Sequence, residues 1–197
     1  MDDYVLDIEN KVKYDLSWFE FFIYHNSKNF TLCEYTADLF KIFRPVGQKP
    51  IKWTNENKQK YKGIYELGLE LEKIGLTDQL NNVCYFGKMG KNEFISEHAD
   101  PNRGCNLVLP LTDSCIIQYK KIGTYKLEDY LNIDPYGTNN GTVRPTKDLP
   151  IKYQYNGPTI INAKIPHQVI NRADTDRNVF YWSIKENFND VKQCLKN

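Results

Sequence analysis

The sequence predicts a mainly β protein, a sandwich or barrel with flanking helices. Three features indicate this: short runs of β-forming residues after about residue 80, turn signals such as Gly87, Gly90 and Gly157-Pro158 between the runs, and a helical pattern before them. The expected strands are Val83–Phe86, Phe94–His98, Asn106–Leu111, Cys115–Lys120, Ile151–Tyr155, Thr159–Asn162, Gln168–Asn171 and Asn178–Ile184. About eight strands at such spacing are typical of sandwiches and barrels.

The first eighty residues are expected to be mostly helical or irregular and to support one face of the β region. Apolar residues recur in steps of three and four over Asn55–Ile74, which predicts a helix. Thr54 is a suitable N-cap, and Gly75 is well placed to end the helix. The apolar segment Leu16–Tyr24 precedes it, and Tyr35–Phe43 is interpreted as a short helix.

The length of 197 residues fits a single domain, residues 1–197. In this division residues 1–80 form the support and residues 81–187 the β core. The segment Ile122–Pro150 is rich in turn residues and is interpreted as a long insertion in that core. Loops of this length are often lids or substrate-facing elements.

Charge and cysteine content restrict the classes of partner. A formal net charge of +1 argues against a nucleic-acid-binding surface. No apolar run is long enough to span a bilayer, and the first residues lack the regions of a signal peptide. The five Cys are odd in number and form no C-x-x-C pair, which indicates free thiols in a reducing compartment. We therefore expect a cytoplasmic protein with no nucleic-acid or membrane partner; nothing in the sequence indicates an oligomeric state.

Two of the three His residues lie where they could bind a metal. His98 and Asp100 form an H-x-D motif at the end of an expected strand, and His167 opens a later one. Residues two apart on a strand point to the same face, so His98 and Asp100 can reach one ion. Two imidazoles and one carboxylate suit non-haem iron(II), because they leave open positions on the metal. Alone, an H-x-D motif is weak, since a turn carboxylate beside a hydrogen-bonded His has the same pattern.

Arg177 strengthens the interpretation. It follows the turn Asp174–Asp176 and opens the last expected strand. If His167 and Arg177 lie on neighbouring antiparallel strands joined by this turn, both can point into the barrel. A guanidinium binds a carboxylate through two parallel hydrogen bonds, which suits a dicarboxylate whose other end reaches the metal. The alternative for Arg177 is a surface ion pair within the turn.

These residues together resemble the Fe(II)/2-oxoglutarate-dependent oxygenase superfamily. The segment YFGKMGKNEFISEHAD resembles the approach to the first ligand in prolyl-hydroxylase-like members. HADPNRGCNLVLPL and PHQVINRADTDR are similar to the branch that hydroxylates aspartyl, asparaginyl and free proline substrates. The likeness covers about residues 83–185. It implies a double-stranded β-helix, the jelly-roll barrel that cupins also have.

The resemblance implies a set of functional residues. The iron(II) ligands would be His98, Asp100 and His167. Arg177 would bind the distal carboxylate of the cosubstrate 2-oxoglutarate, and Tyr85 is a weaker candidate for the same end, with a core aromatic as its alternative. Arg103 would bind either the cosubstrate or an anionic group of the substrate. The implied activity is a dioxygenase that hydroxylates an amino-acid, peptide or protein side chain, with no catalytic residue beyond the metal ligands.

Two other functions remain open at this point. A cupin-like metalloenzyme that does not use 2-oxoglutarate would keep the three ligands but have Arg177 pointing away from them. A non-catalytic β-sandwich with a binding or structural role would have the candidate ligands scattered.

Overall fold

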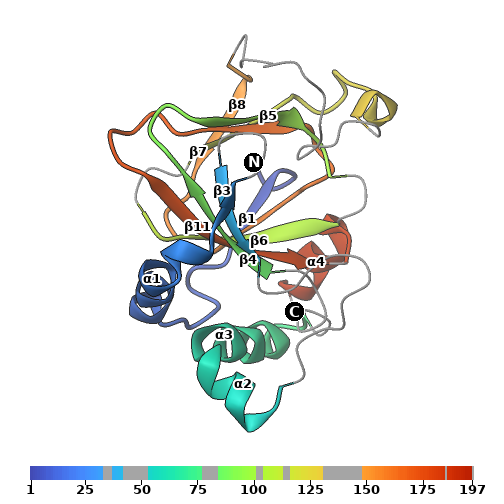
Figure 1. Ribbon diagram of the computed structural model, residues 1–197. Coiled ribbons are helices and arrows are strands. Elements are labelled where there is room, and N and C mark those ends of the chain that lie inside the picture. Colours follow the sequence, from blue (N-terminus) through green and yellow to red (C-terminus); the bar gives the residue numbers. More distant parts are fainter. Residues whose placement is uncertain are drawn as a thin grey trace.

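A computed structural model of the chain describes residues 1–32, 37–41, 53–76, 84–100, 104–112, 116–130, 148–184 and 186–196. Two antiparallel sheets face each other, with helices outside one of them (Figure 1). The strands are β1 (Val5–Asp7), β2 (Thr31–Leu32), β3 (Ala37–Lys41), β4 (Cys84–Met89), β5 (Phe94–His98), β6 (Cys105–Pro110), β7 (Ile116–Tyr119), β8 (Ile151–Gln154), β9 (Thr159–Ile161), β10 (His167–Ile170) and β11 (Arg177–Ile184). The helices are α1 (Leu16–His25), α2 (Asn55–Lys60), α3 (Lys62–Lys73), α4 (Phe188–Cys194) and the short 3₁₀ helices η1 (Ser27–Asn29) and η3 (Leu127–Tyr130).

The strand order confirms a jelly-roll. The larger sheet, here the major sheet, has the order β1-β9-β6-β11-β4-β3-β2, and the minor sheet has the order β5-β10-β7-β8. From β4 onward the chain passes from one sheet to the other at nearly every described strand, and among these strands only β7 and β8 follow one another in the same sheet. This winding between two facing sheets is the double-stranded β-helix, and all eight strands expected after residue 80 are part of it.

Strand β11 shows how one strand supplies two cores. Its side chains point alternately to the two faces of the major sheet, as in any strand. Phe180, Trp182 and Ile184 belong to a cluster between the major sheet and the helices, here the outer cluster. Val179 and Tyr181 belong to a cluster between the two sheets, here the inner cluster. The further members of the inner cluster include Tyr85, Met89, Val108, Ile117, Tyr119, Ile161 and Val169.

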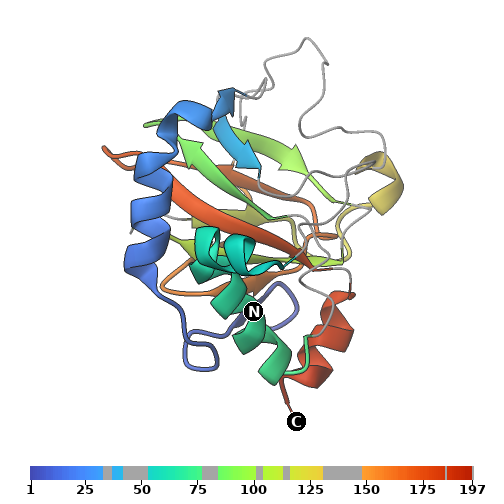
Figure 2. The same cartoon turned by 60° about the horizontal axis from the view of Figure 1, so that its bottom comes forward.

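The helices cover the outer face of the major sheet (Figure 2). The Phe19 ring of α1 lies 5.0 Å from the Phe180 ring, and Phe22 stacks on Phe86 at 5.2 Å between ring centroids. Leu67 of α3 is fully buried in the same cluster. Aromatic pairs at these separations add to the stabilisation that burial gives. None of the described helices is both long enough and apolar enough to cross a membrane.

The predicted helix at Asn55–Ile74 is two helices. The chain breaks at Tyr61, whose φ and ψ are −115° and 38°, so α2 and α3 are separate. The predicted cap is confirmed, because the Thr54 side chain accepts a hydrogen bond from the Asn57 amide at 3.2 Å. The predicted stop is also confirmed, since Gly75 follows α3 with φ +86°, a backbone conformation that favours glycine.

Gly63 is required by close packing between α1 and α3. A Cβ atom at this position would lie 2.3 Å from Cε3 of Trp18, whose ring is itself packed against Phe19 and Phe22. Gly63→Ala is therefore expected to destabilise the protein by about 1–3 kcal/mol, although alanine is the better helix former. Thermal unfolding should show a fall in Tm of roughly 2–4 °C per kcal/mol. The exposed Leu69→Ala on the same helix is the control, and an unchanged Tm for Gly63→Ala would contradict the packing argument.

The first eighty residues also contribute strands, which the sequence did not indicate. The short helix expected at Tyr35–Phe43 is wrong, because Ala37–Lys41 is strand β3, paired antiparallel with β4. Residues 33–36 and 42–43 lie outside the described part of the chain. Strand β1 likewise adds to the far edge of the major sheet beside β9. Hydrogen bonding to an open sheet edge makes such a segment a strand, even where its local sequence pattern favours a helix.

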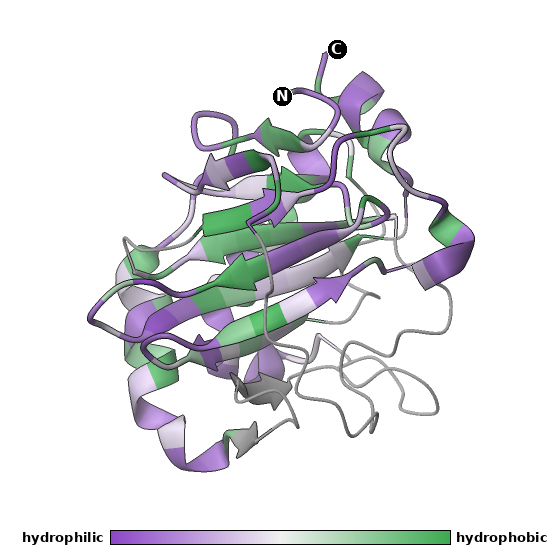
Figure 3. Ribbon diagram, turned by 90° about the horizontal axis from the view of Figure 1, so that it is seen from above, coloured by the Kyte–Doolittle hydropathy of each residue, from purple (hydrophilic) through white to green (hydrophobic). Residues whose placement is uncertain are grey.

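Two residues near the described ends of the insertion at 122–150, Tyr130 and Leu149, contact outward-facing side chains of the minor sheet. The hydroxyl of Tyr130 donates to Glu97, and Lys120 pairs with Glu97 at 2.7 Å. The amide of Leu149 donates to Gln118 Oε1 at 2.9 Å, although Gln118 is on an outward-facing position. The strands of this sheet carry hydrophilic as well as hydrophobic bands (Figure 3). Residues 131–147, to which the expected lid role applies, lie outside the described residues.

Candidate metal centre

The two candidate imidazoles lie side by side in the minor sheet. His98 ends β5, His167 begins β10, and the two are direct partners in the antiparallel pair. Their ring centroids are 4.4 Å apart, and the two residues are 6% and 3% exposed. Residues far apart in the sequence are thus brought into contact by strand pairing.

Both imidazoles are held in the same way by the backbone. Nδ1 of His98 lies 2.7 Å from the carbonyl oxygen of Ser96, and Nδ1 of His167 lies 2.8 Å from that of Ile165. A carbonyl oxygen only accepts, so each Nδ1 must carry the hydrogen, and each Nε2 of the neutral ring then has a lone pair. Metal-binding histidines typically donate their other ring nitrogen to a carbonyl or carboxylate in this way.

The environment keeps His167 neutral. Its burial and the neighbouring His98 lower its pKa to about 4, while the Asp100 carboxylate raises it in part. At neutral pH the imidazole is therefore uncharged, the state in which it can bind a metal.

Asp100 lies near enough to affect the pKa of His167, but it does not form a metal-binding group with the two histidines. Its backbone amide donates to the carbonyl oxygen of Ala163 at 2.8 Å, and its Oδ2 accepts from Nδ2 of Asn106 at 3.3 Å. Across the described residues, no three His, Cys, Asp or Glu side chains stand together in a group that could hold a metal ion. The structure thus brings two of the three predicted ligands together and places the third nearby.

Arg177 faces the interior from the opposite sheet. The expectation that His167 and Arg177 lie on neighbouring strands is wrong, because β10 belongs to the minor sheet and β11 to the major sheet. The turn between them crosses from one sheet to the other. Arg177 shares the inward face of Val179 and Tyr181, is 1% exposed, and donates from Nη1 to the Tyr181 hydroxyl at 3.0 Å. A surface ion pair is therefore excluded for this guanidinium.

The other two residues predicted to contact the cosubstrate are Tyr85 and Arg103. Tyr85 is 5% exposed and belongs to the inner cluster, where its ring stacks on Tyr181 at 4.9 Å and an interplanar angle of 27°. It is joined through Tyr181 to Arg177, which makes it part of the same interior patch. Arg103 lies outside the described residues.

Tyr119 is an interior polar residue that the sequence analysis missed. It is the partner of His167 across β7 and β10, with ring centroids 5.7 Å apart. Its hydroxyl is fully buried and has no hydrogen-bond partner among the described residues. Burial, with a smaller effect of Tyr153 and Tyr181, raises its pKa well above the usual range. The available signal was strand alternation, which points Tyr119 inward together with Ile117.

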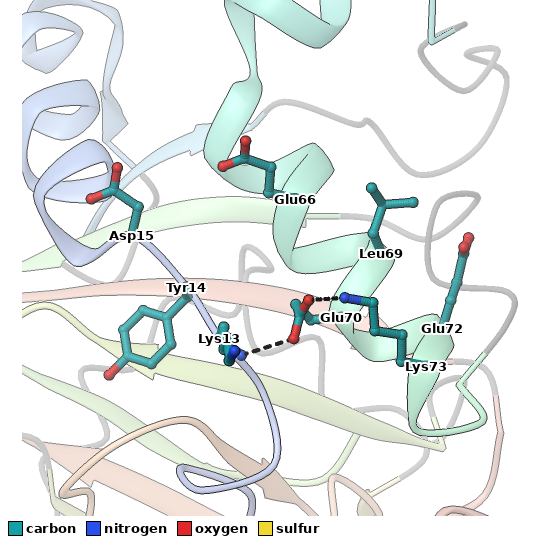
Figure 4. A pocket seen from close by; sticks show the side chains of 8 residues that line it. All are labelled: Lys13, Tyr14, Asp15, Glu66, Leu69, Glu70, Glu72 and Lys73. Atoms are coloured by element: carbon teal, nitrogen blue, oxygen red, sulfur yellow. Dashed lines mark hydrogen bonds and ion pairs between the residues drawn. The ribbon is translucent and has the colours of Figure 1, made fainter.

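A surface pocket lies elsewhere, between α3 and the segment before α1 (Figure 4). Its lining includes Asp15, Glu66 and Glu70, and Glu70 is bonded to Lys73 and to the backbone amide of Lys13. These elements pack on the outer face of the major sheet, so the sheet separates this pocket from the histidines. It is therefore not the candidate site.

Comparison with known proteins gives a shared fold. No protein-family model matches the sequence, and no curated protein matches it. The structure is similar to that of HygX from Streptomyces hygroscopicus with nickel and 2-oxoglutarate bound, at 9% identity and a TM-score of 0.53 over 93% of this chain and 82% of that one. It is also similar to an oxidoreductase of the 2OG-Fe(II) oxygenase family from Burkholderia pseudomallei, at 13% identity and a TM-score of 0.52 over 93% and 85%.

Proposed function

We propose that this protein is a non-haem iron(II)- and 2-oxoglutarate-dependent dioxygenase that hydroxylates an amino-acid, peptide or protein side chain. The histidine pair carries the proposal. His98 and His167 are adjacent, buried and fixed through Nδ1, so that both Nε2 atoms are suited to bind one metal ion. The fold shared with 2-oxoglutarate oxygenases supports it.

His98, Asp100 and His167 would hold the iron. This requires the Asp100 carboxylate to turn from its position beside Asn106 towards the imidazoles, while its backbone amide keeps the bond to Ala163. Iron(II) with 2-oxoglutarate and oxygen would supply the oxidising chemistry, and the protein has to bind, orient and exclude water.

The interior patch opposite the histidines would bind the cosubstrate. The Arg177 guanidinium and the Tyr181 hydroxyl are buried together and can both donate to the distal carboxylate of 2-oxoglutarate. The buried Tyr119 hydroxyl beside His167 is a further donor for the same molecule. Apolar side chains of the inner cluster, such as Val108 and Val179, would keep water from the bound cosubstrate.

The position of Arg177 favours this function over its alternatives. A metalloenzyme that does not use 2-oxoglutarate has no need of a buried guanidinium in its interior, and Arg177 is inside rather than directed away. A non-catalytic sandwich has no need of two adjacent imidazoles with matching backbone hydrogen bonds. The near-neutral net charge of +1 agrees with an amino-acid or protein substrate rather than a nucleic acid.

The test is an anaerobic titration of the metal-free protein with iron(II) and then with 2-oxoglutarate. A visible absorption band is expected only when both are present, because the band arises from chelation of the metal by the cosubstrate. Iron binding without a band would favour a metalloenzyme of another kind. Absence of iron binding would leave a non-catalytic β-sandwich.

A further inference from the structure

Strand β5 has a bulge immediately before His98. In the pairing of β5 with β10, Ile95 lies opposite Val169. His98 lies opposite His167, so three steps along β5 match only two steps along β10. One extra residue of β5 therefore stands between Ile95 and His98. A bulge of this kind redirects the side chains that follow it, and bulges are common next to functional sites.

The bulge decides which side chain of β5 faces the interior. Ile95 packs against the inner cluster, so it points inward. In a regular strand the side chains alternate, and Glu97 would then point inward opposite His167, with His98 on the outer face. The extra residue reverses this arrangement. His98 is buried with its ring beside that of His167, and the Glu97 side chain is 29% exposed.

Glu97 is anchored on the outer face of the minor sheet by two side chains. Lys120 pairs with its carboxylate at 2.7 Å, and the Tyr130 hydroxyl donates to it. Lys120 also donates to the Tyr130 hydroxyl at 2.5 Å, so the three side chains form one cluster. A regular register would move the Glu97 carboxylate inside, which would break both contacts and bury its charge among apolar side chains. The cluster therefore favours the bulge.

We propose that Glu97 is a positioning residue, which fixes the bulge of β5 and so keeps the His98 imidazole inside the barrel, where it can bind a metal together with His167. The metal-binding part of this inference rests on the proposed function. Tyr130 ends η3, so the start of the insertion at 122–150 helps to hold His98 in place. Outer partners of metal ligands typically contribute about 10- to 100-fold to metal affinity.

The first test measures the register without any metal. Diethyl pyrocarbonate acylates accessible imidazole nitrogens, and mass spectrometry of the peptides identifies which histidine has reacted. His25 is exposed and is the internal reference, whereas His98 and His167 are buried and should react slowly in the wild type. In Glu97→Leu the side chain at 97 prefers the interior and has no anchor, so the reaction rate at His98 should rise at least about 10-fold relative to His25. The rate at His167 should stay low.

The second test is calorimetric titration with Co(II), an air-stable substitute for iron(II). The dissociation constant should rise about 10- to 100-fold in Glu97→Leu and by a smaller factor in Lys120→Met, which loses one of the two anchors. Lys120→Met is also the second variant, in case the leucine variant does not fold. Lys152→Met is the matched control, because Lys152 pairs with Asp148 at 2.7 Å and lies on β8, at the opposite edge of the same sheet from β5. It should bind Co(II) like the wild type.

An unchanged reaction rate at His98 in Glu97→Leu would overturn the inference. Equal increases at His98 and His167 would also overturn it, because they would indicate a general loosening of the fold instead of a change of register. If the wild type bound Co(II) and both variants bound it equally well, the role of Glu97 in metal binding would fail alone. If the wild type bound neither Co(II) nor iron(II), the proposed function would fail, and the reactivity of His98 would still decide whether Glu97 sets the register.

Discussion

Replacing His167 with alanine is expected to weaken iron(II) binding by more than about 100-fold, beyond the loss that an outer partner of a ligand causes. His167 is 3% exposed, its Nδ1 is held by Ile165, and its ring lies against that of His98. The variant therefore removes one of the two Nε2 atoms that could bind the metal, and His98 loses the imidazole that lies beside it.

The measurement is calorimetric titration with iron(II) under nitrogen, together with the rise in Tm that the metal gives. His25→Ala is the matched control, because His25 is the third histidine of the chain and is exposed at the end of α1, against Phe21. His25→Ala should bind metal like the wild type. If His167→Ala also did so, the histidine pair would not be the metal site.

Replacing Arg177 with methionine is expected to raise the dissociation constant for 2-oxoglutarate at least about 30-fold and to leave iron(II) affinity unchanged. Loss of one partner of a buried, hydrogen-bonded charge pair costs about 2–5 kcal/mol, and about 2 kcal/mol corresponds to that factor. The guanidinium lies on the opposite sheet from the histidines, so the metal should not respond to its removal.

Arg172→Met is the control for this change. Arg172 follows β10 on the connection that leads to Arg177, but its side chain is 60% exposed and pairs with Asp148. Tyr181→Phe should give an intermediate loss of cosubstrate affinity, since it keeps the stacking on Tyr85 and removes only the hydroxyl that accepts from Arg177. Unchanged 2-oxoglutarate binding in Arg177→Met would contradict the role of Arg177 in binding this cosubstrate and would favour a metalloenzyme that does not use it.

Much of the β region could be predicted from sequence because its signals are local. Alternation, β-forming residues and turns identify the strands of the jelly-roll, and the Thr54 cap and the Gly75 stop are properties of single residues. The resemblance in the H-x-D segment and around His167 selected the candidate ligands. The sequence could also place Arg177 at the start of a strand, since the turn before it is explicit.

The sequence could not show which sheet each strand joins. The turn before Arg177 suggested a hairpin with β10, whereas the two strands are in facing sheets, and the segment at Ala37–Lys41 became a strand by pairing with β4. Such pairings depend on contacts between residues distant in the chain, and a local sequence pattern does not show these contacts.

By itself, then, the sequence determined the strands after residue 80, the helix start at Thr54, the helix end at Gly75 and the chemical types that could form a metal site. Only the tertiary structure decided which side chains meet. Pairing of β10 with both β5 and β7 places His167 between His98 and Tyr119, and facing of the two sheets puts Arg177 in the same interior. The contact between Asn106 Nδ2 and Asp100 Oδ2, at 3.3 Å, is likewise a feature of the folded chain alone. The physical reason is that strand alternation fixes the face of a side chain, while the partner on that face depends on register and sheet order.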